Sequence, residues 1–75
     1  MKNIKIVLNK QDYPPHVQRV IEEAEELDIK INKLENSIDN NPLFKELPEI
    51  DQSLMQRQLG IMLDYLEILD KRLIF

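Results

Sequence analysis

The stretch VQRVIEEAEELDIKINKLENSI, residues 17–38, decides the fold of this chain. Its apolar residues recur at alternating intervals of three and four: Val17, Val20, Ala24, Leu27, Ile31, Leu34 and Ile38. A helix of 3.6 residues per turn places such residues on one side. Two prolines precede the stretch, where the first turn of a helix tolerates proline, and Asp39-Asn40-Asn41-Pro42 follows it. The spacing therefore predicts a long amphipathic helix over about 16–38.

A second helix is predicted over about 51–73. Lys71 and Arg72 stand near its C-terminal end, where the helix dipole favours positive charge. Its inner face is formed by six apolar residues: Met55, Leu59, Met62, Leu66, Leu69 and Leu73. The two predicted helices have similar lengths and can pair from end to end. We therefore expect an all-α fold, an antiparallel two-long-helix hairpin that forms a single helical domain over 13–75.

The segments outside the two helices have their own patterns. The connection over 39–50 carries four large apolar residues: Leu43, Phe44, Leu47 and Ile50. A solvated loop would not carry them, so we expect this apolar connecting segment to fold back as a lid, with a turn of helix. Residues 1–12 are expected to form a short N-terminal arm. Ile4, Ile6 and Leu8 alternate there with other residues as in a strand, and an extended arm fits equally well.

The second helix has more apolar surface than one partner helix covers. Large apolar patches are rare on soluble monomers and usually mark an interface. We therefore expect a homo-oligomeric helical bundle, with these interface residues: Leu54, Gly60, Ile61, Leu63, Tyr65 and Ile68. Gly60 is the only glycine and costs a helix interior about 1 kcal/mol relative to alanine. It indicates a close backbone crossing, with chance tolerance as the alternative.

Composition excludes several classes of function. Ten Lys and Arg against 14 Asp and Glu give a net charge of −4, which argues against a binder of DNA, RNA or anionic membrane. With no Cys and one His, neither a zinc site nor another cofactor is expected. There is no apolar run of membrane-spanning length and no secretory signal pattern, so we expect a cytoplasmic protein. Catalytic motifs are absent from the sequence, and an enzyme is not expected.

Six residues are candidates for ligand binding: Tyr13, His16, Arg19, Lys30, Lys33 and Arg72. The first three surround the start of the first helix and offer an aromatic ring, an imidazole and a guanidinium, which suit a base and a phosphate. A structural interpretation competes with this one. In it, Tyr13 staples the helix entry, Arg19 pairs with Glu22 or Glu23, and the other cations are solvated partners or complete the helix dipole.

A longer pattern carries a family resemblance. It reads Val17-x-Arg19-Val20-Ile21-Glu22-Glu23-x-x-Glu26-Leu27-x-x-Lys30-x-x-Lys33-Leu34, then Phe44-x-x-Leu47, then Gln58-Leu59-x-x-Met62-x-x-Tyr65-x-x-Ile68-Leu69-x-x-Arg72. This pattern resembles a family of small helical proteins of crAss-like and other bacteriophages and prophages. It is also similar to the phage anti-CBASS cyclic-nucleotide sponges.

The resemblance to the sponges implies a fold, an assembly and a function. The sponges are compact helical homohexamers that sequester cyclic dinucleotides and trinucleotides between protomers, without catalysis. By this resemblance Tyr13 matches the stacking tyrosine, Lys30 the lysine of the first helix, and Arg72 the C-terminal arginine. The chain differs from the sponges in its Tyr-to-Lys interval and at Leu66-Glu67, where the sponges carry a basic segment.

The resemblance therefore implies a non-catalytic anti-defence protein, made in the cytoplasm of an infected bacterial host. Its partners are expected to be a cyclic oligonucleotide or related nucleotide signal, held between protomers, and further copies of itself, six in the sponges. The alternative is a small protein-interaction module, a phage inhibitor or adaptor that acts through the apolar face of the second helix.

Overall fold

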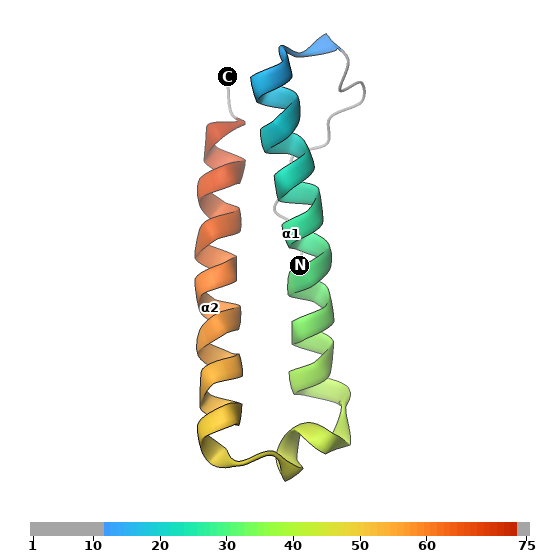
Figure 1. Ribbon diagram of the computed structural model, residues 1–75, viewed down its shortest axis with the longest axis vertical. Coiled ribbons are helices and arrows are strands. Elements are labelled where there is room, and N and C mark those ends of the chain that lie inside the picture. Colours follow the sequence, from blue (N-terminus) through green and yellow to red (C-terminus); the bar gives the residue numbers. More distant parts are fainter. Residues whose placement is uncertain (1–11, 74–75) are drawn as a thin grey trace.

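The computed structural model describes residues 12–73, which form a hairpin of two long helices (Figure 1). Helix α1 spans Pro15–Asn40, a short 3₁₀ helix η2 spans Pro42–Glu46, and α2 spans Glu49–Arg72. The two long helices pack side by side in opposite directions, so that the start of α1 lies beside the end of α2. Residues 12–73 contain no strand, which confirms the all-α prediction. The expected arm over 1–12 lies outside the described residues, apart from Asp12.

The entry to α1 is fixed by proline and by one side chain. Pro14 is extended and caps the helix, and its carbonyl oxygen accepts hydrogen bonds from the backbone N–H groups of Val17 and Gln18 at 2.9 and 3.0 Å. The Gln18 side-chain amide also donates to the carbonyl oxygen of Tyr13 at 2.7 Å. These bonds hold the residues before the helix against its first turn. The position of Tyr13 relative to α1 is thereby set.

The connection between the long helices contains a 3₁₀ helix, and most of its large apolar side chains are exposed. The Asn41 carboxamide oxygen accepts a hydrogen bond from the backbone N–H of Leu43 at 3.0 Å, which starts η2. Phe44 alone of the four large apolar residues is buried. The other three, Leu43, Leu47 and Ile50, are exposed. The expected turn of helix is present, whereas the expectation of a lid was wrong for these three side chains: Phe44 alone turns inward from η2, and Leu47 and Ile50 lie beyond that turn.

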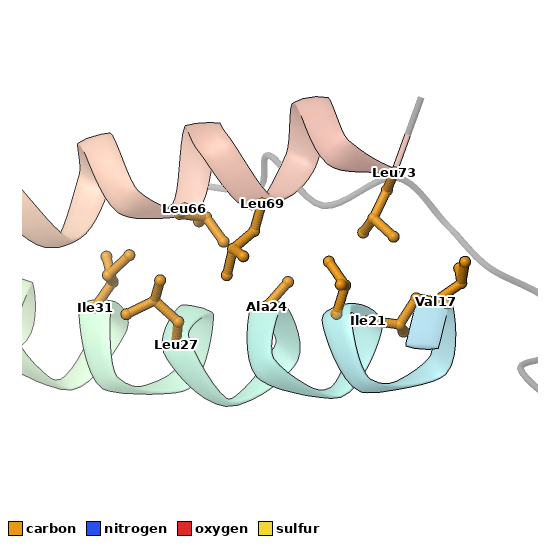
Figure 2. Close-up of a cluster of buried hydrophobic side chains, with 9 residues drawn as sticks. Val17, Ile21, Ala24, Leu27, Ile31, Leu66, Leu69 and Leu73 are labelled. Carbon is orange, nitrogen blue, oxygen red and sulfur yellow. The ribbon is translucent and has the colours of Figure 1, made fainter. Parts of the chain in front are cut away.

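The core lies toward the open end of the hairpin, away from η2 (Figure 2). It contains Val17, Val20, Ile21, Ala24, Leu27, Ile31, Leu66, Leu69 and Leu73. The side chains of Leu66, Leu69 and Leu73 point from α2 toward α1 between the labelled residues of α1. Toward η2 the packing is looser, since Leu34, Ile38 and Met55 are only half-buried.

Helix α2 is poorly covered for its length. Only Leu66 and Leu69 are fully buried among its 24 residues. Four of its large aliphatic side chains are between 52 and 65% exposed: Ile50, Leu54, Ile61 and Ile68. The second apolar side predicted for this helix therefore faces solvent in the protomer. Across residues 12–73, neither helix has the length of apolar sequence required to cross a membrane.

Candidate functional site

A shallow groove runs between the two helices on one face of the hairpin. Its walls are formed by Lys30, Lys33, Leu34 and Ser37 of α1, and by Gln58 and Met62 of α2. The groove has a volume of about 350 Å³ and is widely open to solvent. The helices pack loosely at the groove, because the fully buried leucines of α2, Leu66 and Leu69, lie farther along the chain, nearer the open end of the hairpin. Two of the six predicted ligand-binding residues, Lys30 and Lys33, therefore lie together in one hollow.

A second hollow of about 380 Å³ adjoins the groove and belongs to α2. Its walls are Leu54, Arg57, Gln58, Ile61 and Met62, so it shares Gln58 and Met62 with the groove. The two hollows therefore open on the same face of the hairpin. We call this side the groove face, defined by Lys30, Lys33, Ser37, Leu54, Gln58 and Ile61.

Helical spacing extends the groove face toward the open end. Arg19 comes eleven residues before Lys30, and Arg72 comes eleven residues after Ile61. Eleven residues make three turns, so each arginine shares a side of its helix with a groove-face residue. Leu73 points toward the first turns of α1, between Ile21 and Val17 (Figure 2). Both arginines therefore lie toward the open end of the hairpin, one near the start of α1 and one at the end of α2.

The six predicted residues are not gathered in one place within a single chain. Arg19 and Lys30 are separated by about 16 Å along α1, from the rise of 1.5 Å per residue. Tyr13 is half-buried and packs against the core, as the stapling interpretation expects. His16 is exposed at the start of α1. One protomer therefore presents two separate groups, Lys30 with Lys33 and the group at the open end.

The cations of the groove face are free of ion pairs within residues 12–73. Lys30, Lys33, Arg19 and Arg72 have no carboxylate partner there, so the proposed pairing of Arg19 with Glu22 or Glu23 is not formed. The ion pair that is formed joins Lys71 to Glu67 at 3.5 Å, with both groups exposed. The lysine ammonium groups of the groove are therefore available to an anion.

Other polar groups of the groove are already engaged. The Ser37 hydroxyl donates to the carbonyl oxygen of Lys33 at 3.0 Å, and the Gln58 amide approaches the Met62 sulfur at 3.8 Å. The remaining wall, Leu34 and Met62, is apolar. The groove thus combines two free positive charges with an apolar surface, which suits a flat ring that carries phosphate.

Carboxylates occur on both sides of the hairpin, and one of them, Asp28, is buried. Asp28 and Glu35 are seven residues apart and share a side of α1, and Asp70 lies on the corresponding side of α2. By the same spacing, Glu23 shares the side of α1 that carries Lys30, so carboxylates lie beside the cations of the groove face as well. Within residues 12–73 no three side chains of the metal-binding types come together, so no metal site is assigned.

The predicted interface residues divide between two environments. Leu54, Ile61, Tyr65 and Ile68 are exposed, whereas Leu63 is half-buried and packs against the core. Gly60 is exposed, and a β-carbon added to it would meet no atom within 4 Å, so no backbone crosses it within the protomer. The expected crossing at Gly60 concerns contacts between copies and stays a prediction.

Comparison with known protein families decides the relationship of this chain. A family model described as Sequestin matches residues 14–74. The chain belongs to the Sequestin family. The matched range contains α1, η2 and α2, and so both walls of the groove, while Tyr13 falls just outside it. No curated protein and no solved structure matches the chain.

The Sequestin family name denotes sequestration, a binding role without turnover. The resemblance to a sequestering family, predicted from the helix pattern, is therefore confirmed. The origin in crAss-like phages stays a prediction. Sequence reasoning proposed Lys30 and Lys33 as ligand-binding residues but did not place Ser37, Gln58 and Met62 beside them. The spacing of each helix indicates the side on which a residue lies, but not which residue of the other helix lies across from it.

Proposed function

We propose that this Sequestin-family protein binds and sequesters a cyclic nucleotide immune messenger, a cyclic dinucleotide or trinucleotide, without catalysis. The observation that carries the proposal is the pair Lys30 and Lys33, which lack carboxylate partners among residues 12–73 and border an otherwise largely apolar groove. Ammonium groups bind phosphate oxygens as charge-assisted donors. The apolar wall of Leu34 and Met62 offers a surface to a base.

The groove is too open to enclose a ligand within one chain, which supports the proposal that the binding pockets form between protomers. Its volume of about 350 Å³ is within the range of small-molecule sites, roughly 300–1,000 Å³. Such sites bury most of their ligand, whereas this groove is walled on two sides only. A second protomer that covers the groove face would close it. The same assembly would bring further cations, Arg19 and Arg72, to the several phosphates of a cyclic oligonucleotide.

The biological role proposed is anti-defence. A protein produced in excess over an immune messenger lowers its free concentration by binding alone, and no bond of the messenger needs to break. Because each site holds one messenger and does not turn it over, sequestration depends on tight binding and not on a catalytic rate. The absence of a catalytic constellation from the sequence fits this mode of action.

The experiment is isothermal titration of the protein with cyclic dinucleotides, cyclic trinucleotides and ADP-ribose derivatives. We expect saturable binding of at least one cyclic oligonucleotide, with recovery of the unchanged compound after denaturation. Binding restricted to ADP-ribose derivatives would retain sequestration and overturn the ligand class. If no compound of the panel produced a heat of binding or a thermal shift of the protein, the proposal would be overturned.

A second candidate is a protein-interaction module, favoured by the exposure of Leu54, Ile61 and Ile68. A pull-down from a bacterial host would then yield a stoichiometric partner, and Ile68→Asp should abolish its capture. Ile68 is the better probe than Leu63, since Leu63 packs against the core and its replacement would also destabilise the fold.

A further inference from the structure

The exposed side of α2 has a symmetrical pattern of residues. We define the α2 stripe as Ile50, Leu54, Arg57, Ile61, Tyr65, Ile68 and Arg72. The intervals along it are 4, 3, 4, 4, 3 and 4, and they read the same in both directions from Ile61. Because six turns of an α-helix take about 22 residues, the whole stripe lies on one side of α2. All seven members are exposed in the protomer.

From this symmetry we infer that α2 packs against α2 of a second copy, antiparallel, about a two-fold axis at Ile61, and that Tyr65 of each copy completes the groove of the other. A two-fold contact requires one patch to complement itself. With the two-fold axis at Ile61, Leu54 lies opposite the partner's Ile68. Two aliphatic pairs and the central Ile61 pair then bury the apolar side chains that the protomer leaves exposed.

The charges of the stripe select the antiparallel direction. Arg57 lies opposite the partner's Tyr65 and next to the partner's Asp64, so its guanidinium meets an aromatic ring and a carboxylate. A parallel pair in the same register would place Arg57 against Arg57 and Arg72 against Arg72. Like charges held in contact destabilise such a pair. The central part of the stripe, from Leu54 to Ile68, is therefore complementary to itself in the antiparallel direction, while Ile50 lies opposite the partner's Arg72 at each end.

The same register brings an aromatic ring to the groove. Gln58 and Tyr65 are seven residues apart and share the edge of the stripe that faces α1. In the antiparallel pair, Gln58 therefore lies beside the partner's Tyr65. Gln58 is also a wall of the groove that contains Lys30 and Lys33, a groove without an aromatic residue among its lining side chains. The partner's Tyr65 would supply the stacking surface for a base next to those lysines.

The chain has no cysteine, so single cysteine variants report the register directly. Disulfides form only when the two α-carbons come within about 7 Å of each other. Under mild oxidation we expect Ile61→Cys to form a covalent dimer. Leu54→Cys alone should stay monomeric on a denaturing gel, whereas a mixture of Leu54→Cys and Ile68→Cys chains should cross-link. The matched control is Ser53→Cys, exposed on another side of α2 and nearly isosteric.

The position of Tyr65 is tested without any ligand. A mixture of Gln58→Cys and Tyr65→Cys chains should form the mixed disulfide dimer in preference to either homodimer. Self-cross-linking of Leu54→Cys as fast as Ile61→Cys would overturn the antiparallel register. A wild-type mass of 8.9 kDa by light scattering of a concentrated solution, with no cross-link from Ile61→Cys, would overturn the contact itself.

The stacking role rests on the proposed function and has a separate readout. Tyr65→Leu keeps an apolar side chain and should keep the dimer, yet lose about tenfold in ligand affinity, while Tyr65→Phe should keep both. Equal affinity of Tyr65→Leu and wild type would overturn the stacking role. If no nucleotide of the panel binds wild type, the proposed function and the stacking role fail together, and the cysteine pairs still decide the two-fold contact.

Discussion

Lys30 of α1 and Gln58 of α2 line one groove, although more than a third of each long helix and the whole of η2 separate them along the chain. The hairpin brings them together because α1 and α2 pack along their length in opposite directions (Figure 1). Lys30 contributes a charge without a carboxylate partner within residues 12–73, and Gln58 lies between the groove and the exposed α2 stripe. The relationship joins the candidate binding site to the surface proposed for a second copy.

Removal of one groove lysine should weaken nucleotide binding and leave the fold intact. We expect Lys33→Ala to lower the affinity by about tenfold, because a charge-assisted hydrogen bond to phosphate is lost. Titration calorimetry measures the effect. The control is Lys71→Ala, which removes a lysine paired with Glu67 and should bind as wild type. Equal affinities of the two variants would show that the ligand binds elsewhere.

Salt should weaken the same interaction. The screening length falls from about 10 Å at 0.1 M ionic strength to about 3 Å at 1 M. Because Lys30 and Lys33 are exposed, their attraction for phosphate is strongly screened at the higher concentration. We expect the affinity of wild type to fall by about tenfold across that range, and that of Lys33→Ala to fall by less. An affinity independent of salt would mean that base contacts dominate binding.

The core at the open end should dominate the stability of the protomer. Leu69 is fully buried, and Leu69→Ala should lower the free energy of unfolding by about 2–5 kcal/mol, through lost burial and a cavity. Chemical denaturation followed by circular dichroism measures this change. Leu43→Ala removes a similar side chain that is 63% exposed, and should change stability by less than about 0.5 kcal/mol. Similar losses in the two variants would contradict the location of the core.

Gly60 provides a test that distinguishes two expectations. Within the protomer nothing lies close to the added β-carbon, so Gly60→Ala should stabilise the helix by about 0.5–1 kcal/mol and raise the melting temperature. Helical spacing places Gly60 outside the α2 stripe, so the assembled state should be retained. Dissociation of the oligomer by Gly60→Ala would instead support the close crossing predicted from the sequence.

The sequence predicted the helical part of the fold well, because its signal is periodic. The alternation from Val17 to Ile38 identified the inner side of α1, but it omitted Ile21, which is 1% exposed. A helix packed in a hairpin buries a wider side than a strict alternation of three and four describes. Ile21 occupies the edge of that wider side.

The connection and the site were less accessible to sequence reasoning. The sequence showed that the connection contains large apolar residues, but only the geometry of the turn selects Phe44 over Leu43 for burial. Lys30 and Lys33 were proposed as ligand-binding residues from their type and, for Lys30, from the resemblance. Whether Gln58 and Met62 lie across from these lysines depends on how far α2 is shifted along α1. The short connection determines that shift, and the periodicity of each helix does not.

Native mass spectrometry of the unmodified protein with a saturating cyclic oligonucleotide tests the central claim most directly. We predict an oligomer that carries the messenger, and release of that messenger with its original mass when the protein is denatured. A bare 8.9 kDa chain without ligand, or a messenger recovered as cleaved product, would contradict sequestration in a groove completed by a second copy.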